Sequence, residues 1–76
     1  MRFEKLVKIY GVNDDGTVTI SYETDNKKYD YIRAQARFNV LKELEKLDRG
    51  TDIQCEFGIV YLRGRGLVLQ LISFEV

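Results

Sequence analysis

One stretch of helical periodicity, residues 39–50, interrupts a chain whose apolar residues otherwise recur at every second position. Asn39 has a side chain that can cap the start of a helix, and Gly50 is the residue type that commonly follows a helix end. Between them, apolar residues spaced three and four apart fall on one side of a helix, with charged residues on the other. We therefore expect one amphipathic helix of about three turns that covers an apolar surface. The apolar positions are Val40, Leu41, Leu44 and Leu47.

Strand-like alternation occupies the rest of the chain. Strands are expected over residues 2–12, 16–23, 28–38, 51–63 and 67–76, separated by polar turns at 13–16, 24–27 and 63–66. Gly11 indicates a bend or bulge in the first strand. In the last strand the apolar residues change parity between Leu71 and Ile72, which implies a bulge or burial on both faces, including at a dimer contact. The predicted order is strand, strand, strand, helix, strand, strand.

The composition limits both the fold and the chemistry. The 76 residues, 45% of them hydrophobic, make one small domain, residues 1–76. Histidine is absent, Cys55 is the single cysteine, and no pair of carboxylates lies in an apolar setting, so we expect no enzyme, no metal and no cofactor. The net charge of zero excludes a histone-like binder that works by charge alone, but not a local positive face.

The start of the chain alternates charged and apolar residues, and no run approaches the roughly 18 apolar residues that span a membrane. An unpaired cysteine suits a reducing compartment. We therefore expect a cytoplasmic protein without a membrane partner.

Residues 28–38 carry the strongest functional pattern in the chain. As an extended strand, this stretch has one apolar face, and its other face carries tyrosine rings followed by guanidinium groups. Rings beside positive charges on a solvent-facing sheet suit a single nucleic-acid strand, because bases stack on the rings and phosphates pair with the cations. Two structural readings compete: tyrosine and arginine commonly cover sheet surfaces, and a helix that starts near Ala34 would remove the alternation.

The turn at residues 63–66 reads Arg-Gly-Arg-Gly and places two cations at the tip of a hairpin. These arginines could hold phosphates, or they could serve only solubility. By contrast, the turn at residues 13–16 carries Asp14 and Asp15, which make a poor surface for phosphate. The candidate nucleic-acid-binding residues are Lys28, Tyr29, Tyr31, Arg33, Arg37, Arg63 and Arg65.

The element order resembles the oligonucleotide/oligosaccharide-binding (OB) fold, a five-stranded Greek-key barrel whose helix plugs one end. The closing segment, residues 57–69, is also similar to the last hairpin of small phage single-stranded DNA-binding proteins. The resemblance implies a binding surface on strands two and three, flanked by the one–two and four–five loops. On this chain that surface would add Thr19 and Ser21 to the candidate residues.

Two functions therefore stand as expectations. The first is non-catalytic binding of single-stranded DNA, with RNA as an open alternative, by a homo-oligomer, with a dimer favoured. The alternative is a protein-interaction module on the same barrel: an adaptor, an inhibitor or a structural subunit of a phage or mobile-element complex. Tyrosine and arginine also anchor protein interfaces, so the composition is compatible with both.

Overall fold

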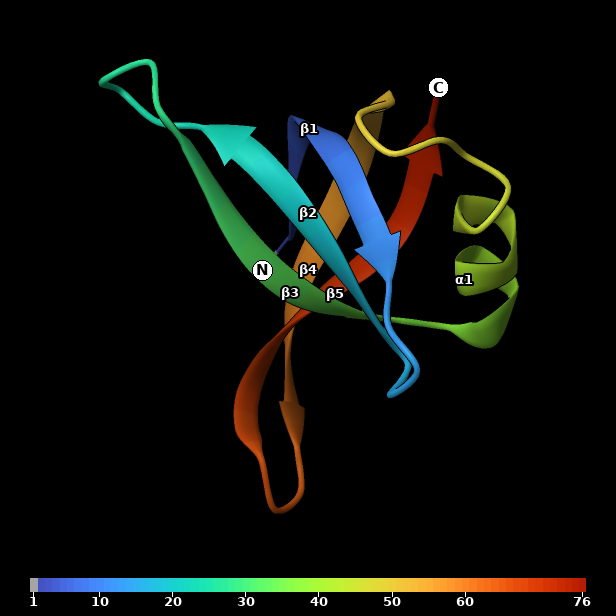
Figure 1. Cartoon of the computed structure of the whole chain (residues 1–76). Helices are drawn as coiled ribbons and strands as arrows, with labels where there is room; N and C mark the ends of the chain where they lie inside the picture. The colour runs from blue at the N-terminus through green and yellow to red at the C-terminus, as the bar shows by residue number, and fades with distance from the viewer. Residues whose placement is uncertain (1) are drawn as a thin grey trace.

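Figure 1 shows the computed structural model, which describes residues 2–76. The described chain forms five strands and one helix in the predicted order. The elements are β1 (Arg2–Val12), β2 (Thr17–Glu23), β3 (Tyr29–Ala36), α1 (Phe38–Leu44), β4 (Asp52–Leu62) and β5 (Gly66–Glu75). The protein is thus mainly β, as predicted.

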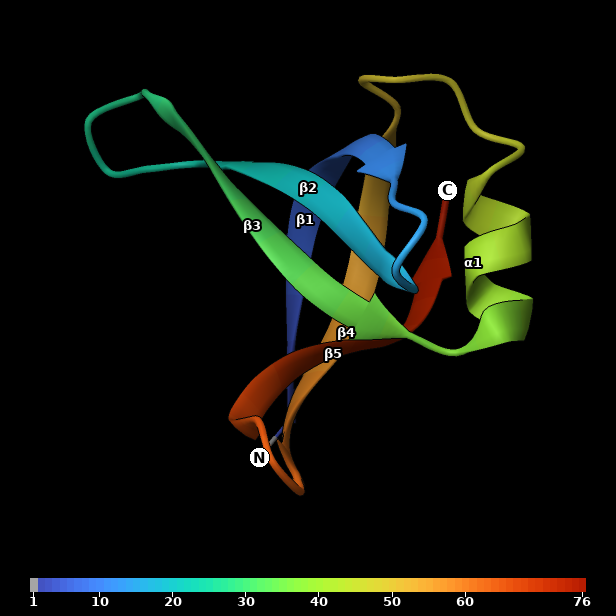
Figure 2. The same cartoon turned by 60° about the horizontal axis from the view of Figure 1, so that its bottom comes forward.

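The strands close into a barrel with the order β1-β2-β3-β5-β4. Neighbouring strands run antiparallel except β3 and β5, which are parallel and share only the pairs Gln35–Gln70 and Ala36–Leu71. Helix α1 follows this junction and lies at one end of the barrel (Figure 2). The predicted five-stranded barrel is therefore confirmed.

Side chains at alternate strand positions fill the barrel. Val18 and Ile20 of β2 point inward between residues of β1, β3 and β4, and Leu44 of α1 adds its side chain from the end. Cys55 belongs to this core, and burial raises the pKa of its thiol to about 12. The fully packed residues are Val7, Ile9, Val18, Ile20, Ala34, Leu44, Ile53, Cys55, Phe57 and Leu71.

Two predicted irregularities occur where the sequence indicated them. The pairing of β1 with β2 shifts between Ile9 and Gly11, which makes Tyr10 the extra residue of a bulge. The pairing of β4 with β5 shifts where Phe57 faces Leu71 but Glu56 faces Ser73, which leaves Ile72 without a direct partner. This second bulge explains the change of parity in the last strand.

The three hairpin turns also form as predicted. In the first, Asn13 N–H donates to the Thr17 carbonyl oxygen at 2.8 Å; in the second, Thr24 N–H donates to that of Lys28 at 2.7 Å. In the third, Arg65 N–H donates to the Leu62 carbonyl oxygen at 3.0 Å. The turns therefore fix which strands become neighbours in the barrel.

The prediction for the junction of the third strand and the helix was wrong in its boundaries. The strand ends at Ala36, because the barrel closes there, and Arg37 is the N-cap of α1 in place of Asn39, with no side-chain capping bond. Phe38, expected inside, is 72% exposed. Its ring instead lies 4.9 Å from Lys42 Nζ.

The helix is also shorter than predicted. After Leu44 the backbone tightens, with Lys46 N–H bonded to the Glu43 carbonyl at 3.3 Å and Leu47 N–H to that of Leu44 at 3.0 Å. The chain then leaves the helix direction and reaches β1, where Gly50 N–H donates to the Ile9 carbonyl at 2.8 Å. Leu47 still packs against the core, so the expected covering role holds over a shorter helix.

Two hairpins extend beyond the barrel: β2–β3 on one side and β4–β5 on another (Figures 1 and 2). We call residues 59–69 of the β4–β5 hairpin the arm. Tyr61 and Leu67 form a cross-strand pair on the arm and are 72% and 75% exposed. Within residues 2–76 no helix is long and apolar enough to cross a membrane.

Candidate nucleic-acid interface

The outer face of β1, β2 and β3 carries the centre of the predicted site. Tyr31 faces Ser21 across the ladder, and Arg33 faces Thr19. Because Val18, Ile20 and Ala34 point into the barrel from the intervening positions, Tyr31 and Arg33 must project away from it. Tyr31 is 60% exposed, which leaves its ring accessible.

A second tyrosine, which the sequence analysis did not select, lies next to Tyr31. Tyr10 follows the buried Ile9 at the bulge in β1 and points outward, and the two ring centroids are 5.1 Å apart at an interplanar angle of 71°. This edge-to-face contact holds the rings in a defined relation to each other. The alternation of β1 was the available signal, since Tyr10 directly follows the buried Ile9 and so points to the outer face.

Arg49 is a second residue that sequence reasoning missed as part of the site. Its guanidinium carbon lies 4.4 Å from the centroid of the Tyr10 ring. Two backbone bonds to Ile9 of β1 hold this segment: Gly50 N–H donates to the Ile9 carbonyl at 2.8 Å, and Ile9 N–H donates to the Thr51 carbonyl at 3.0 Å. Nothing in the periodicity around Arg49 indicates this return to the first strand.

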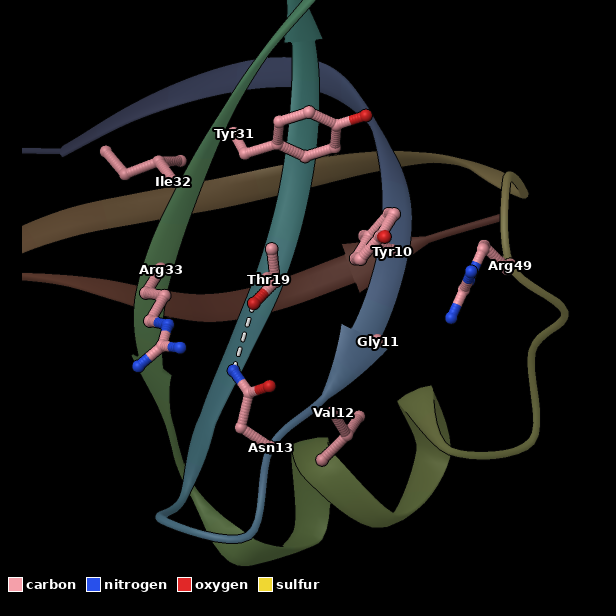
Figure 3. Close-up of a pocket in the computed structure, with 9 residues that line it drawn as sticks. All are labelled: Tyr10, Gly11, Val12, Asn13, Thr19, Tyr31, Ile32, Arg33 and Arg49. Atoms are coloured by element: carbon pink, nitrogen blue, oxygen red, sulfur yellow. Dashed lines mark hydrogen bonds between the residues drawn. The ribbon is translucent and has the colours of Figure 1, made fainter.

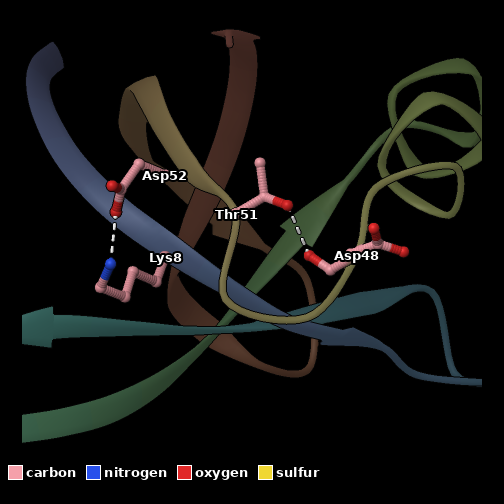
Figure 4. A network of polar contacts seen from close by, with 4 residues as sticks. All are labelled: Lys8, Asp48, Thr51 and Asp52. Atoms are coloured by element: carbon pink, nitrogen blue, oxygen red, sulfur yellow. Dashed lines mark hydrogen bonds and ion pairs between the residues drawn. The ribbon is translucent and has the colours of Figure 1, made fainter.

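Further polar contacts hold the same segment (Figure 4). The Thr51 hydroxyl donates to the Asp48 carbonyl oxygen at 2.7 Å, which closes the turn after the helix. Lys8 Nζ lies 2.7 Å from Asp52 Oδ1, and this hydrogen bond raises the pKa of Lys8. Lys8 is therefore committed to Asp52, although it lies on the outer face of β1.

An open hollow of about 530 Å³ lies between Tyr10, Tyr31, Arg33 and Arg49. Figure 3 shows Tyr31 and Tyr10 on one side of it, with Arg33 and Arg49 at separate edges and Asn13 near the β1–β2 turn. We call this surface the platform, defined by Tyr10, Asn13, Thr19, Tyr31, Arg33 and Arg49.

A chain of hydrogen bonds forms the polar end of the platform. Asp15 Oδ1 accepts from the Thr17 hydroxyl at 2.6 Å and from the Thr17 N–H at 3.1 Å. Asn13 Nδ2 donates to Thr17 Oγ1 at 2.9 Å and to Thr19 Oγ1 at 3.0 Å. The bond from the Thr17 hydroxyl, aided by the charge of Arg33, lowers the pKa of Asp15. The Asp15 carboxylate of the acidic turn is therefore engaged by Thr17 of β2.

The structure brings together only part of the predicted residue set. Tyr29 lies on the same face of β3 as Tyr31 and Arg33 but on the extending hairpin, and Lys28 lies in the turn before it. Arg37, predicted on this face, instead borders a separate hollow with Arg2. Arg63 and Arg65 lie in the turn at the tip of the arm, outside the residues that line the platform.

The arginines of the platform form no ion pair with another described residue, although the charge of Arg33 acts on Asp15. Three ion pairs occur between described residues, and they engage Arg2, Lys8 and Lys46. Arg33 and Arg49 are in none of them. Within residues 2–76 there is no group of three or more side chains of the metal-binding types. The chemistry on offer at the platform is therefore stacking, hydrogen bonding and attraction of anions.

Comparisons with protein-family models, with curated proteins and with solved structures found no match. The assignment of the fold therefore depends on this chain's own topology, a closed five-stranded barrel with one helix. That topology is compatible with an OB-like fold.

Proposed function

We propose that this protein binds single-stranded nucleic acid, with single-stranded DNA the favoured ligand, on the platform. The observation that carries the proposal is the exposed Tyr31 ring, positioned by Tyr10 inside a hollow that two unpaired arginines border. A base stacks on Tyr31, and Arg33 and Arg49 neutralise the phosphates on either side of it. The resemblance of the element order to the OB fold, and of residues 57–69 to the closing hairpin of small phage single-stranded DNA-binding proteins, supports the same function.

The physical contributions differ in kind. One base stacked on a tyrosine contributes ~1–3 kcal/mol, whatever the base, because every base has a π face. The arginines add attraction that depends on salt. Since the net charge is zero, long-range attraction is weak and affinity depends on these local contacts. RNA fits the same contacts, and a cytoplasmic setting suits either ligand.

Fluorescence anisotropy with a labelled oligo-dT of about 20 nucleotides tests the proposal, since one barrel of this kind occupies roughly 4–16 nucleotides. Tyr31→Ala should weaken binding roughly fivefold to hundredfold. Phe38→Ala is the matched control, because this ring is at least as exposed but lies on α1, outside both the platform and the arm. The absence of saturable binding at low salt, or equal effects of the two substitutions, would overturn the proposal.

Salt dependence measures the phosphate contacts separately. Replacing Arg33 or Arg49 with glutamine should each reduce the slope of log affinity against log salt by about 0.7, the value for one phosphate of a single strand. The pair Arg63→Gln and Arg65→Gln shows whether bound nucleic acid extends to the tip of the arm. Unchanged slopes for both platform variants would contradict the assigned role of these two arginines.

A second proposal concerns the arm and is the alternative function, a protein-interaction surface. Among residues 2–76, β4 does not pair with β1 beyond Gly58, and β5 pairs with β3 only at Gln70 and Leu71. The arm therefore carries two free strand edges together with exposed apolar side chains. We propose that a second copy of the chain occupies it, edge to edge and antiparallel, since this arrangement keeps the two arginine-bearing tips apart. Such a dimer would place two platforms in one particle.

A further inference from the structure

The hydrogen bonds around Asn13 have a fixed direction. A carboxylate only accepts hydrogen bonds, so the Thr17 hydroxyl, 2.6 Å from Asp15 Oδ1, must give its single proton to Asp15. The Thr17 oxygen can then only accept from the side chain of Asn13, 2.9 Å away. The atom that faces Thr17 is therefore the amide nitrogen, and the amide cannot be reversed without losing this bond.

Both protons of this amide nitrogen are used. One goes to Thr17 Oγ1 and the other to Thr19 Oγ1, at 2.9 and 3.0 Å. The backbone also anchors the residue, since Asn13 N–H donates to the Thr17 carbonyl at 2.8 Å. Asn13 therefore has no donor to offer a ligand. Its carbonyl oxygen Oδ1 remains, and among residues 2–76 no hydrogen bond reaches it.

The free oxygen is directed into the platform. Asn13 is one of the residues that line the hollow, and Figure 3 shows its oxygen turned away from Thr19 toward the β1 side. Asn13, Thr19 and Tyr31 all line this hollow, so the free oxygen is available to the edge of a base that occupies it. A prearranged acceptor at that position selects edges that carry a donor.

We propose that the platform reads one base edge and prefers a base with an exocyclic amino group, cytosine first among the pyrimidines. This inference rests on the proposed binding of single-stranded nucleic acid. Cytosine carries an amino group where thymine and uracil carry a carbonyl oxygen. The amino group donates to Asn13 Oδ1, whereas the carbonyl places two acceptors against each other. In most recognition of adenine, asparagine uses its donor and its acceptor together; here only the acceptor is free.

Competition among labelled pyrimidine oligomers of equal length tests this preference at neutral pH. Oligo-dC should bind roughly twofold to tenfold more tightly than oligo-dT, the effect of one net hydrogen bond. Oligo-dU serves as the control for the thymine methyl group and should match oligo-dT. An oligomer of 2-pyrimidinone, which lacks the amino group of cytosine, should lose the preference with the protein unchanged.

Two variants locate the preference in the chain. Asn13→Ala should lower the affinity for oligo-dC to that for oligo-dT while the Tyr31 contribution persists. Thr17→Val removes the oxygen that orients the Asn13 amide. The amide can then rotate and donate from its nitrogen to the carbonyl of thymine, so the ratio of dC to dT affinity should fall. The ligand series needs no substitution, so the test stands even where a variant folds poorly.

The outcomes separate the two proposals. If no oligomer binds, the proposed function itself fails. If all oligomers bind with equal affinity, or if Asn13→Ala folds and keeps the preference for oligo-dC, binding stands and base reading by Asn13 is overturned.

Discussion

The platform and the arm both expose a tyrosine and two arginines, yet their surroundings differ. On the platform, Tyr31 touches Tyr10, and its strand lies directly over packed core residues. On the arm, Tyr61 faces Leu67 on a ribbon that extends past the barrel. The comparison teaches that exposure alone does not define a binding site. A ring on a fixed surface, beside directed polar groups, suits a flat polar ligand, whereas a ring on a free apolar ribbon suits another ribbon.

The largest expected difference between the two regions concerns stability. Ile20→Ala removes a buried side chain beneath the platform and should lower the free energy of unfolding by about 2–5 kcal/mol. Leu67→Ala on the arm should change it by less than about 0.5 kcal/mol, because the side chain already contacts water. Urea denaturation measures both. Similar losses for the two variants would mean that the arm is part of the folding core.

Self-association should show a smaller but selective effect. The double variant Tyr61→Ser/Leu67→Ser should weaken dimer formation by at least about tenfold, because it removes both exposed apolar side chains of the arm. Phe38→Ser is the matched control, since this ring is equally exposed near the helix. Sedimentation at several protein concentrations measures the change. A monomeric wild-type protein, or an equal effect of Phe38→Ser, would refute the proposed role of the arm.

The smallest expected effect is a change in stability at acid pH that comes from Asp15, beside the platform. Because the folded-state pKa of Asp15 is lowered below 3.8, its carboxylate contributes stability above that pH, and the contribution is lost as the pH falls through the folded value. Asp15→Asn should therefore be less stable than wild type near neutral pH, and the difference should vanish in strong acid. Denaturation midpoints across this range measure it. A difference that persists unchanged into strong acid would assign the effect to packing instead.

Much of the fold was predictable because its signals are local. The turn residues at 13–16, 24–27 and 63–66 set the hairpins, and the two breaks in strand parity, at Gly11 and Ile72, marked real bulges. The helix boundaries were not predictable in this way. Periodicity continues to Leu47, but the helix ends at Leu44 because the following segment bonds to Ile9, far away in the sequence.

The site was predictable only where one strand carries it. Tyr31 and Arg33 follow from the alternation in β3 alone. The outward direction of Tyr10 follows from alternation with the buried Ile9, but its contact with Tyr31 depends on the pairing of β1, β2 and β3. The position of Arg49 depends on backbone bonds to β1. Arg37 was wrongly placed on the strand face because the strand ends one residue earlier, where the barrel closes. Contacts between distant segments determined each of these positions.

The ladders that close the barrel differ in length, and the one between β3 and β5 is the shortest. These strands share two residue pairs, whereas β4 and β5 share nine and β2 and β3 share seven. A fluctuation that separates β3 from β5 therefore breaks fewer backbone hydrogen bonds than one at any other ladder of the described barrel. What remains is a continuous antiparallel sheet in the order β3-β2-β1-β4-β5. When the barrel opens at this junction, β3, which carries Tyr31, becomes an edge strand of the sheet.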